Sequence, residues 1–421
     1  MNLRIIPPDE MLEVSITLPL SKSMSARAPI INKIGGFEPV IELSDSDDTK
    51  ALAEGLSITS GKVDIGASGT AMRFLTAYYA ATEGTDIILD GNERMRQRPI
   101  GILVEALRNI GADIEYCAQE GFPPIHIRGN KLSGGEVQLD PSVSSQFISA
   151  LMMTAPLMMS PLAIRYEGEP SSLPYLKMTA GMMEEAGVSP EFKYNGIEIP
   201  NTPYTQPIVK IERDWSAASY WYSITALSAG WVTLEDMQMK SLQGDSLIKE
   251  MGSRIGVITS ESEETENAVE LSASPEQFSR LEVDMSGTPD LVPTLAVTSA
   301  ILGIPFRFTG VRSLRAKETD RIEALKNEAL KFGMIFENEG DNILFWEGKR
   351  VPMHELPRFC TYGDHRMAMA LAPLAIFVPG IVIEDSDVVT KSYPGYWKDL
   401  QKAGFKFIDG DAPLPEMPSE E

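Results

Sequence analysis

The chain has 421 residues, of which 43% are apolar, so its length favours two or three domains that each bury an ordinary hydrophobic core. Its 60 acidic against 37 basic residues give a formal net charge of −23, which disfavours nucleic acid and an anionic membrane as partners. Two cysteines and three histidines exclude a disulfide framework and leave little for a metal, so we expect a cytoplasmic protein without metal or cofactor.

An amphipathic helical segment that ends near a glycine and runs into two strands recurs about five times along the chain. A repeated α+β unit explains the pattern, because a glycine just after a helix adopts a positive φ without a Cβ penalty. The spacing of roughly 70 to 75 residues is too long for a solenoid. The segments begin at Pro99, Pro174, Ser246, Asp320 and Gly395, and their glycines are Gly111, Gly187, Gly256, Gly333 and Gly404.

A second set of helices is predicted between these copies, at 21–28, 67–75, 141–155, 213–227 and 363–377. Each opens with small polar residues and is then apolar nearly all round, which predicts a buried central helix. The free N–H groups at the start of such a helix can bind an anion. The tail from about Asp409 is acidic and contains prolines, so we expect it to be disordered.

The few basic residues gather at these helix starts. Any one of them could form an ordinary surface ion pair, but the whole set in so acidic a chain indicates an anionic ligand. Lysine supplies a point charge and arginine a two-pronged donor for phosphate or carboxylate. The set comprises Lys22, Arg27, Arg73, Arg94, Arg96, Arg98, Lys317, Arg321, Arg366 and Lys391.

Two carboxylates stand close to these cations in the sequence, Glu318 in KETDR and Asp290 in GTPD. KETDR could be only a capping run in which Thr319 or Asp320 opens a helix, and Asp290 could be a turn residue. A carboxyl group held beside bound anions can also move protons, because neighbouring charges tune its protonation. Both interpretations stay open on the residues alone.

Seven strings, taken in order, resemble the 3-phosphoshikimate 1-carboxyvinyltransferase (EPSP synthase) family from about Pro19 to Leu400. The strings are LPLSKSMSAR, GTAMRFL, RMRQRPIG, SVSSQF, AKETDR, YGDHRMAMALAPLA and TKSYPGYW. The resemblance implies an α+β fold, a two-domain inside-out α/β barrel in which each domain holds three βαβαββ repeats around buried parallel helices. It implies that residues 21–211 form one domain and that residues 1–20 with 212–421 form the other.

The resemblance also implies an enzyme of the shikimate pathway to aromatic amino acids. The family transfers the enolpyruvyl group of phosphoenolpyruvate to the 5-hydroxyl of shikimate 3-phosphate, with loss of phosphate. Both substrates are small polyanions, which would explain the cations at the helix starts. We expect a monomer without a nucleic-acid or membrane partner, and glyphosate as a competitor of phosphoenolpyruvate.

The resemblance further implies the site residues. Asp290 would take the proton of the 5-hydroxyl, whereas Glu318, aided by Lys22, would donate a proton to the methylene carbon and later remove one. Shikimate 3-phosphate would be bound by Lys22, Ser23, Arg27, Ser144, Ser145, Gln146, Ser172, Tyr175, Asp290, Ser313 and Lys317. Phosphoenolpyruvate would be bound, from both domains, by Lys22, Gly69, Arg98, Gln146, Arg321, Arg366 and Lys391.

Two positions depart from the family pattern, and two other functions compete. Ala67 and Ser313 stand where the family commonly has asparagine, and the shorter Ser313 would reach substrate through water. The sister transferase that acts on UDP-N-acetylglucosamine has Lys-Asn where this chain has Lys22-Ser23, and a loop cysteine that RMRQR lacks. A non-catalytic anion-binding protein on the same fold is the other alternative, against which the intact Asp290 and Glu318 argue.

Overall fold

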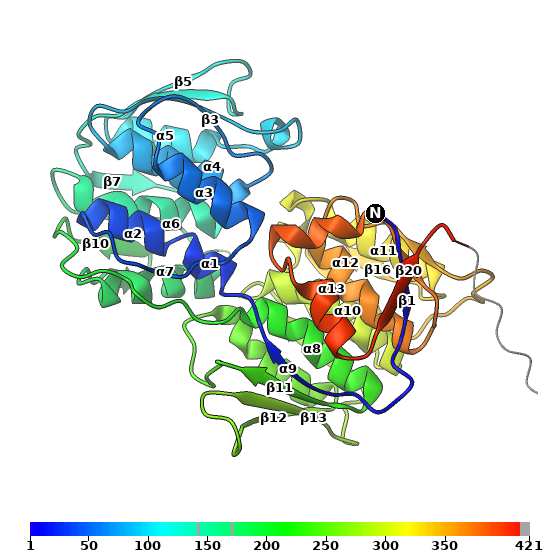
Figure 1. Ribbon diagram of the computed structural model, residues 1–421. Helices are drawn as coiled ribbons and strands as arrows, with labels where there is room; N and C mark the ends of the chain where they lie inside the picture. Colours follow the sequence, from blue (N-terminus) through cyan, green and yellow to red (C-terminus); the bar gives the residue numbers. More distant parts are fainter. Residues whose placement is uncertain (141–143, 169, 171, 413–421) are drawn as a thin grey trace, which may run out of the picture. The chain divides into compact units, whose positions relative to one another are not determined.

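The structure is a computed structural model that describes residues 1–140, 144–168, 170 and 172–412. Contacts within the chain divide it into two compact units, which we describe separately (Figure 1). Unit 1 comprises Met1–Leu18, Trp215–Lys240 and the chain from Asp245 onward, and unit 2 comprises Pro19–Asp214 with the short segment Ser241–Gly244. The Glu212 carboxylate ties that segment to unit 2, since it accepts hydrogen bonds from the backbone of Leu242 (3.1 Å) and the side chain of Gln243 (2.9 Å).

One four-stranded sheet occurs five times with the same topology. Its first two strands in sheet order are parallel, and the remaining two pairings are antiparallel. In four of the five sheets a helix connects the two parallel strands, as a parallel crossover requires. In the fifth, the chain between β2 and β11 runs through the whole of unit 2 before it reaches α8. The repeated α+β unit predicted from the glycine spacing is therefore confirmed.

Unit 2 contains two copies of this repeat. The first is β3 (Ser60–Asp64), α4 (Gly69–Ala81), β4 (Asp86–Asp90), α5 (Gly101–Asn109), β5 (Asp113–Tyr116) and β6 (Ile125–Arg128), with the 3₁₀ turn η1 (Met95–Gln97). The second is β7 (Gly135–Gln138), α6 (Ser145–Thr154), β8 (Leu162–Arg165), α7 (Leu173–Glu185), β9 (Glu191–Lys193) and β10 (Gly196–Ile199), with η2 (Ala155–Leu157).

Unit 1 contains three copies, and two of them take a strand from the N-terminus. The first copy is β2 (Glu13–Thr17), α8 (Trp215–Ser228), β11 (Trp231–Glu235), η3 (Gly244–Leu247), α9 (Ile248–Arg254), β12 (Val257–Glu261) and β13 (Val269–Ala273). The second copy is β14 (Leu281–Asp284), η4 (Pro289–Leu291), α10 (Val292–Leu302), β15 (Phe306–Thr309), η5 (Arg312–Ala316), α11 (Arg321–Lys331), β16 (Glu337–Glu339) and β17 (Ile343–Trp346). The third copy is β18 (Arg358–Phe359), α12 (His365–Leu371), η6 (Ala372–Ile376), β19 (Val382–Ile383), η7 (Ser386–Lys391), α13 (Tyr396–Lys402) and β20 (Lys406–Asp409), with β1 (Leu3–Ile6) from the N-terminus.

A third copy of the repeat was expected in the domain that corresponds to unit 2. The described residues 19–59 and 200–214, where it would lie, contain helices but no β-strand. The helices are α1 (Lys22–Ser25), α2 (Ala28–Gly35) and α3 (Asp47–Leu56). The buried amide of Asn32 replaces a ladder pair, because it donates to the Ile208 carbonyl (3.0 Å) and accepts from the Ile208 N–H (2.8 Å). Prolines at 200, 203 and 207 remove backbone donors that a sheet would use.

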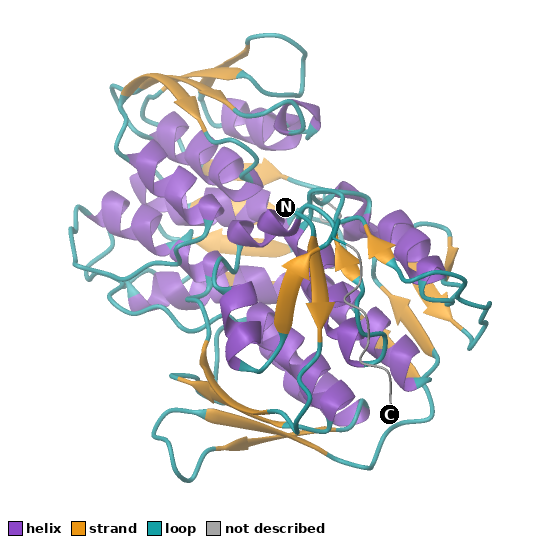
Figure 2. Cartoon of the chain, turned by 45° about the vertical axis from the view of Figure 1, so that its right-hand side comes forward, coloured by secondary structure: helices purple, strands orange, loops and turns teal. Residues whose placement is uncertain are grey.

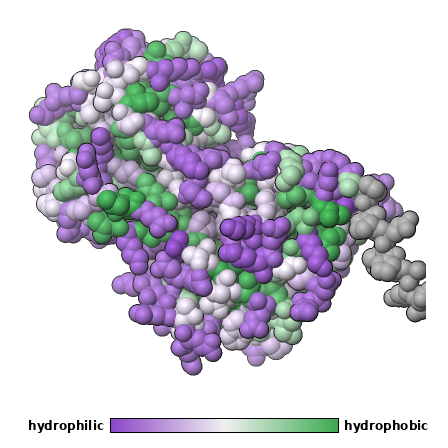
Figure 3. Space-filling model, viewed as in Figure 1, coloured by the Kyte–Doolittle hydropathy of each residue, from purple (hydrophilic) through white to green (hydrophobic). Residues whose placement is uncertain are grey.

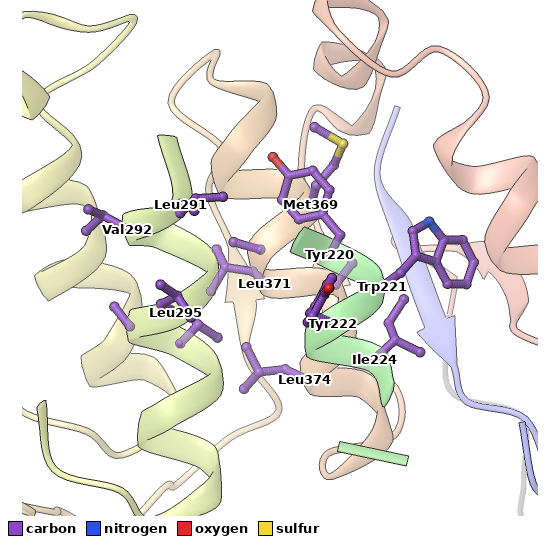
Figure 4. Packing of buried hydrophobic residues seen from close by; sticks show 14 of the residues in the cluster. Tyr220, Trp221, Tyr222, Ile224, Leu291, Val292, Leu295, Met369, Leu371 and Leu374 are labelled. Atoms are coloured by element: carbon purple, nitrogen blue, oxygen red, sulfur yellow. The ribbon is translucent and has the colours of Figure 1, made fainter. Parts of the chain in front are cut away.

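Each unit has its own hydrophobic core, built on the predicted central helices. In Figure 2 the helices of each unit lie side by side, with the strands on their outer side. In unit 1 the helices α8, α10 and α12 pack together through side chains such as Tyr220, Leu295 and Leu371 (Figure 4). In unit 2 almost every residue of α4 is buried, and α4 packs against α6. The prediction of buried central helices is confirmed by α4, α6, α8 and α12. The helix expected at 21–28 is only the single turn α1, and the buried helix α10 was not predicted.

The five glycines predicted to follow the amphipathic helices all adopt a positive φ. Their φ angles lie between 83° at Gly333 and 100° at Gly111, in the range that only glycine adopts freely. Each follows the capping residue of its helix, so a Cβ at these positions would strain the turn that leads into the next strand.

Hydrophilic side chains cover much of the visible face of each unit (Figure 3). In the described part of the chain, no helix combines the length and the apolar character that crossing a membrane requires. The acidic tail was expected to be disordered from about Asp409, but Asp409 is the last residue of β20. The tail beyond residue 412 lies outside the described residues.

Candidate functional site

The charged residues predicted in unit 1 lie at the starts of three helices and at the end of a 3₁₀ turn. Asp290 lies in η4, which leads into α10, and Lys317 and Glu318 directly precede the start of α11 at Arg321. Asp320 caps α11, because its carboxylate accepts from the backbone N–H groups of Ile322 (3.2 Å) and Glu323 (3.3 Å). The capping role considered for KETDR thus belongs to Asp320, and Glu318 is left for other contacts.

Arg321 is the centre of this group. Its guanidinium donates to Asp290 (Nη1 to Oδ1, 2.9 Å) and to Glu318 (Nη2 to Oε2, 2.9 Å). It also binds both oxygens of Asp364, with Nε to Oδ2 at 2.7 Å and Nη2 to Oδ1 at 3.2 Å. Only the planar guanidinium, with five donors in fixed directions, can hold three carboxylates in this way.

Three further cations surround the two predicted catalytic carboxylates. Arg366 Nη2 lies 2.7 Å from Asp290 Oδ2, and Lys317 Nζ lies 3.5 Å from Asp290 Oδ1. Lys391 Nζ lies 3.3 Å from Glu318 Oε1. Together with Arg321, four cations thus face three carboxylates, so this group has an excess of positive charge in a chain whose net charge is −23.

The three carboxylates around Arg321 differ in how far they are exposed to solvent. The side chains of Arg321 and Asp364 are 1% and 0% exposed, whereas those of Asp290 and Glu318 are 16% and 15% exposed. Asp364 is therefore structural: it caps α12 by accepting from Arg366 N (2.9 Å) and orients Arg321. Asp290 and Glu318 remain accessible to a ligand that comes from solvent.

The same burial affects the pKa values of the cations. Burial lowers the pKa of Lys317 from its usual range, against the opposing effect of the nearby Asp290 carboxylate. Burial also acts to lower the pKa of Arg321, but the carboxylates of Asp364, Glu318 and Asp290 outweigh it and raise that pKa. Burial raises the pKa of Tyr220 to about 12, so its hydroxyl, 3.3 Å from Arg366 Nη1, is neutral at physiological pH.

In unit 2, two predicted cations lie on or beside α1. The Lys22 ammonium lies 3.1 Å from Asp48 Oδ2, and both side chains are mostly buried. Arg27 is 2% exposed and donates to Thr179 Oγ1 (2.7 Å), Ser149 Oγ (3.3 Å) and the Ser23 carbonyl. All three acceptors are neutral, and no carboxylate of the described chain forms an ion pair with Arg27.

A buried cation with only neutral partners is costly unless an anion completes its coordination. Burial lowers the pKa of Arg27 to about 10, which leaves the guanidinium charged at neutral pH. The arrangement can therefore bind a phosphate or a carboxylate.

The start of α4 forms a second cationic place in unit 2. A Cβ built on Gly69 would lie against Arg73 Nη1 and 2.5 Å from Arg98 Nη1, so the absence of a side chain at residue 69 leaves room for both guanidinium groups at the helix start. Arg73 Nη1 donates to the Gly69 carbonyl (2.8 Å). Positive charge at a helix N-terminus adds to the effect of the helix dipole on a bound anion.

The hydroxyl and amide residues predicted to bind phosphate lie at the starts of α6 and α7. Ser144 caps α6, and Gln146 Nε2 donates to Thr70 Oγ1 (3.1 Å), which joins the start of α6 to that of α4. Ser172 precedes α7 with φ 58° and ψ 45°, the left-handed region that costs a serine about 1–3 kcal/mol and recurs at functional sites. The first residues of the SVSSQF motif, 142 and 143, lie outside the described residues.

Two predicted residues lie apart from the charged groups described above. Ser313 lies in η5, and among the described residues no hydrogen bond joins its side chain to the Arg321 network. Arg96, expected beside Arg98 as part of an anion site, instead binds Asp90 with Nε at 2.9 Å and Nη2 at 2.7 Å. The neighbouring carboxylate takes up the charge of Arg96, so Arg96 is not part of the site.

Three residues in these contacts were not predicted from the sequence, namely Asp48, Asp364 and Tyr220. Asp364 belongs to the DHR string, and an acidic residue before a buried helix start is a signal for a cap but not for a partner of Arg321. Asp48 and Tyr220 carry no local signal, because their partners Lys22 and Arg366 are far away in the sequence. In the described chain, no group of three or more His, Cys, Asp or Glu side chains could hold a metal.

Comparison with known proteins identifies the family. A family model described as EPSP synthase (3-phosphoshikimate 1-carboxyvinyltransferase) matches residues 40–400. The 3-phosphoshikimate 1-carboxyvinyltransferase of Bacteroides fragilis is 47% identical over 403 residues, which cover 95% of this chain and 97% of that protein. The protein of the same name from Methanospirillum hungatei is 34% identical over 418 residues, covering 92% of this chain and 95% of its own.

The solved structure of EPSP synthase from Acinetobacter baumannii superposes with a TM-score of 0.71 over 97% of this chain and 99% of its own. At 18% sequence identity this likeness establishes the fold, the α+β two-domain architecture expected from the motifs. With the family match over residues 40–400, the conclusion is that this chain belongs to the EPSP synthase (3-phosphoshikimate 1-carboxyvinyltransferase) family.

Proposed function

We propose that the chain transfers the enolpyruvyl group of phosphoenolpyruvate to the 5-hydroxyl of shikimate 3-phosphate and releases phosphate. The observation that carries the proposal is the environment of Asp290 and Glu318. Each is ion-paired with at least two cations and each keeps a partly exposed carboxylate, at 16% and 15%. An anion-binding protein without catalysis would need the cations but not these two accessible carboxylates.

The reaction needs an addition and an elimination. In the addition, the 5-hydroxyl oxygen bonds to C2 of phosphoenolpyruvate, Asp290 accepts the hydroxyl proton, and protonated Glu318, aided by Lys22, donates a proton to C3. In the elimination, the bond between C2 and the phosphate oxygen breaks, and the Glu318 carboxylate takes a proton from the new methyl group. The carbon–carbon double bond reforms, and the products are the enolpyruvyl ether and phosphate.

We assign the remaining residues by the charge and the atoms that they offer. Shikimate 3-phosphate would be bound by Lys22, Ser23, Arg27, Ser144, Ser145, Gln146, Ser172, Tyr175, Asp290, Ser313 and Lys317. The support in unit 2 is that Arg27 is a buried cation with neutral hydroxyl partners, which suits a phosphate. Phosphoenolpyruvate would be bound by Lys22, Gly69, Arg98, Gln146, Arg321, Arg366 and Lys391, where arginine can bind both its carboxylate and its phosphate in a bidentate manner.

The test is an incubation of the purified protein with both substrates while released phosphate is measured. We expect phosphate release that requires both substrates, and a product heavier than shikimate 3-phosphate by one enolpyruvyl group. Release with UDP-N-acetylglucosamine in place of shikimate 3-phosphate would favour the sister transferase. Binding of both anions, measured by calorimetry, without any turnover would favour a non-catalytic anion-binding protein.

The proposal includes a monomer that acts in the cytoplasm on small-molecule substrates only. The net charge of −23 repels polyanionic partners, which supports small-molecule substrates. The two cysteines, Cys117 and Cys360, are free, which supports a reducing compartment such as the cytoplasm. Sedimentation of the protein with and without its substrates tests the monomer, and a dimer under both conditions would contradict it.

A further inference from the structure

Glu328 is a buried carboxylate that the proposed reaction does not use. It lies on α11, two turns after Arg321, and is 0% exposed. Its oxygens accept from the Cys360 N–H (3.0 Å) and the Tyr362 hydroxyl (2.7 Å), and the Lys331 ammonium lies 2.7 Å away. A carboxylate is costly to bury, so these three partners indicate that it holds the segment it contacts in a defined position.

That segment is a strained turn. Tyr362 has φ +54° and Gly363 has φ +66°, so two successive residues are left-handed, and tyrosine has no intrinsic preference for this region. The Asp364 N–H donates to the Thr361 carbonyl (2.8 Å) and closes the turn. A non-glycine residue keeps such a conformation only where its surroundings enforce it, and the bond from the Tyr362 hydroxyl to Glu328 provides that constraint.

The turn leads directly into the anion-binding residues of unit 1. Asp364 is the residue after Gly363, and it caps α12 and binds Arg321 at 2.7 and 3.2 Å. Arg366 follows in the first turn of α12 and lies 2.7 Å from Asp290. A shift of the turn would therefore move Asp364 and Arg366 together and would also change the orientation of Arg321.

The helices α11 and α12 are thus joined at two places, through Arg321 with Asp364 and through Glu328 with Tyr362. A bound anion competes for the donors of Arg321, which weakens the first of these joins. The second join involves no residue assigned to a substrate, so a bound anion does not compete for its donor.

We propose that Glu328, acting through the Tyr362 hydroxyl, is a positioning residue that sets Asp364 and Arg366 for the binding of phosphoenolpyruvate. The inference rests on the proposed function and adds a determinant of affinity for one of its two substrates. Glu328 touches neither substrate in this assignment, so its effect is indirect.

The test uses Glu328→Gln and Tyr362→Phe, which preserve side-chain size and remove the charged acceptor or the hydroxyl donor. We expect KM for phosphoenolpyruvate to rise roughly 10- to 100-fold, since small misplacements of binding groups have effects of this size. KM for shikimate 3-phosphate should stay at its wild-type value. The double variant should bind phosphoenolpyruvate no more weakly than the more impaired of the two single variants, because both changes act on the same contact between residues 328 and 362.

Glu337→Gln is the matched control, because it makes the same change at a partly exposed glutamate of unit 1 that pairs with Lys349. Its KM values should equal those of the wild type. A lowered Tm with unchanged KM values, or an equal rise of KM for both substrates, would overturn the proposal and leave Glu328 a purely structural role. Additive effects in the double variant would also overturn it.

Failure of the proposed function is separately visible, because the wild-type protein would then show no turnover. In that case inorganic phosphate serves as the probe, and calorimetric titration compares the wild type with both variants. Weaker phosphate binding by Glu328→Gln and Tyr362→Phe supports the positioning role, and unchanged binding overturns it.

Discussion

Replacement of Arg321 by lysine tests the central interaction of unit 1 while it conserves the charge. Arg321 is 1% exposed and makes four hydrogen bonds to three carboxylates, at 2.7, 2.9, 2.9 and 3.2 Å. A lysine ammonium places its donors around a single nitrogen atom, so it cannot reach Asp290, Glu318 and Asp364 together. Asp364, which is 0% exposed, would then lose a bidentate partner.

Loss of one partner from a buried ion pair costs about 3–5 kcal/mol, because the remaining charge is left without compensation. Because lysine keeps one positive charge, we expect this cost to be the upper limit of the fall in the free energy of unfolding of unit 1 in Arg321→Lys. With an m-value of about 2–3 kcal/mol per molar urea, the midpoint of urea unfolding should fall by up to roughly 1–2.5 M. Activity should fall as well, since Arg321 is assigned to phosphoenolpyruvate.

Urea unfolding followed by tryptophan fluorescence and by circular dichroism measures the change. The control is Arg307→Lys, because Arg307 also binds a carboxylate with two nitrogen atoms, to Glu339 at 3.0 and 2.6 Å, but at the surface. Exposed pairs contribute little to stability, so the control should unfold close to the wild type. Equal midpoints for the wild type and Arg321→Lys would refute the argument that the buried guanidinium holds the three carboxylates.

Three further predictions concern activity. Asp290→Asn and Glu318→Gln should keep the fold, as judged by circular dichroism, but lose about 10²–10⁴-fold in kcat, and turnover within a few-fold of the wild type would refute their role. Arg366→Ala should weaken phosphoenolpyruvate by roughly 2–5 kcal/mol and Arg27→Ala should weaken shikimate 3-phosphate instead, so equal losses for both substrates in calorimetric titrations would contradict the assignment. Because burial lowers the pKa of Lys317, its positive charge is lost as pH rises from neutral towards about 10.4, the ordinary lysine value. KM for shikimate 3-phosphate should therefore rise over this window in the wild type but not in Lys317→Arg, and parallel pH profiles would refute it.

Much of the fold follows from local features of the chain. Glycine after a helix adopts a positive φ because it has no Cβ, and this preference depends on the residue itself rather than on its tertiary neighbours. The five glycines from Gly111 to Gly404 therefore reveal the repeat, and all five have the predicted conformation. Helices that are apolar all round, such as α4, must be buried wherever they pack, so their place in the core is also predictable.

The interactions of the charged side chains depend on tertiary structure. Arg321 and Asp364 are 43 residues apart, and Lys22 and Asp48 are 26 apart, so no local pattern links either pair. Arg96 and Arg98 look equivalent in RMRQR, yet Arg96 pairs with Asp90 whereas Arg98 lies at the start of α4. A cation pairs with whichever carboxylate lies near it in the folded chain, and the sequence does not specify that neighbour. The packing of the repeats therefore decides which charged residues form pairs.

The sheets show the same division between local and tertiary determinants. Residues 19–59 form helices like those of the other repeats, but no strand of a sheet lies among them. The two hydrogen bonds between the Asn32 amide and the Ile208 backbone replace strand pairing there, across 176 residues of sequence. Residue patterns predict where helices begin and end, but a contact between distant segments depends on geometry that only the packed chain provides.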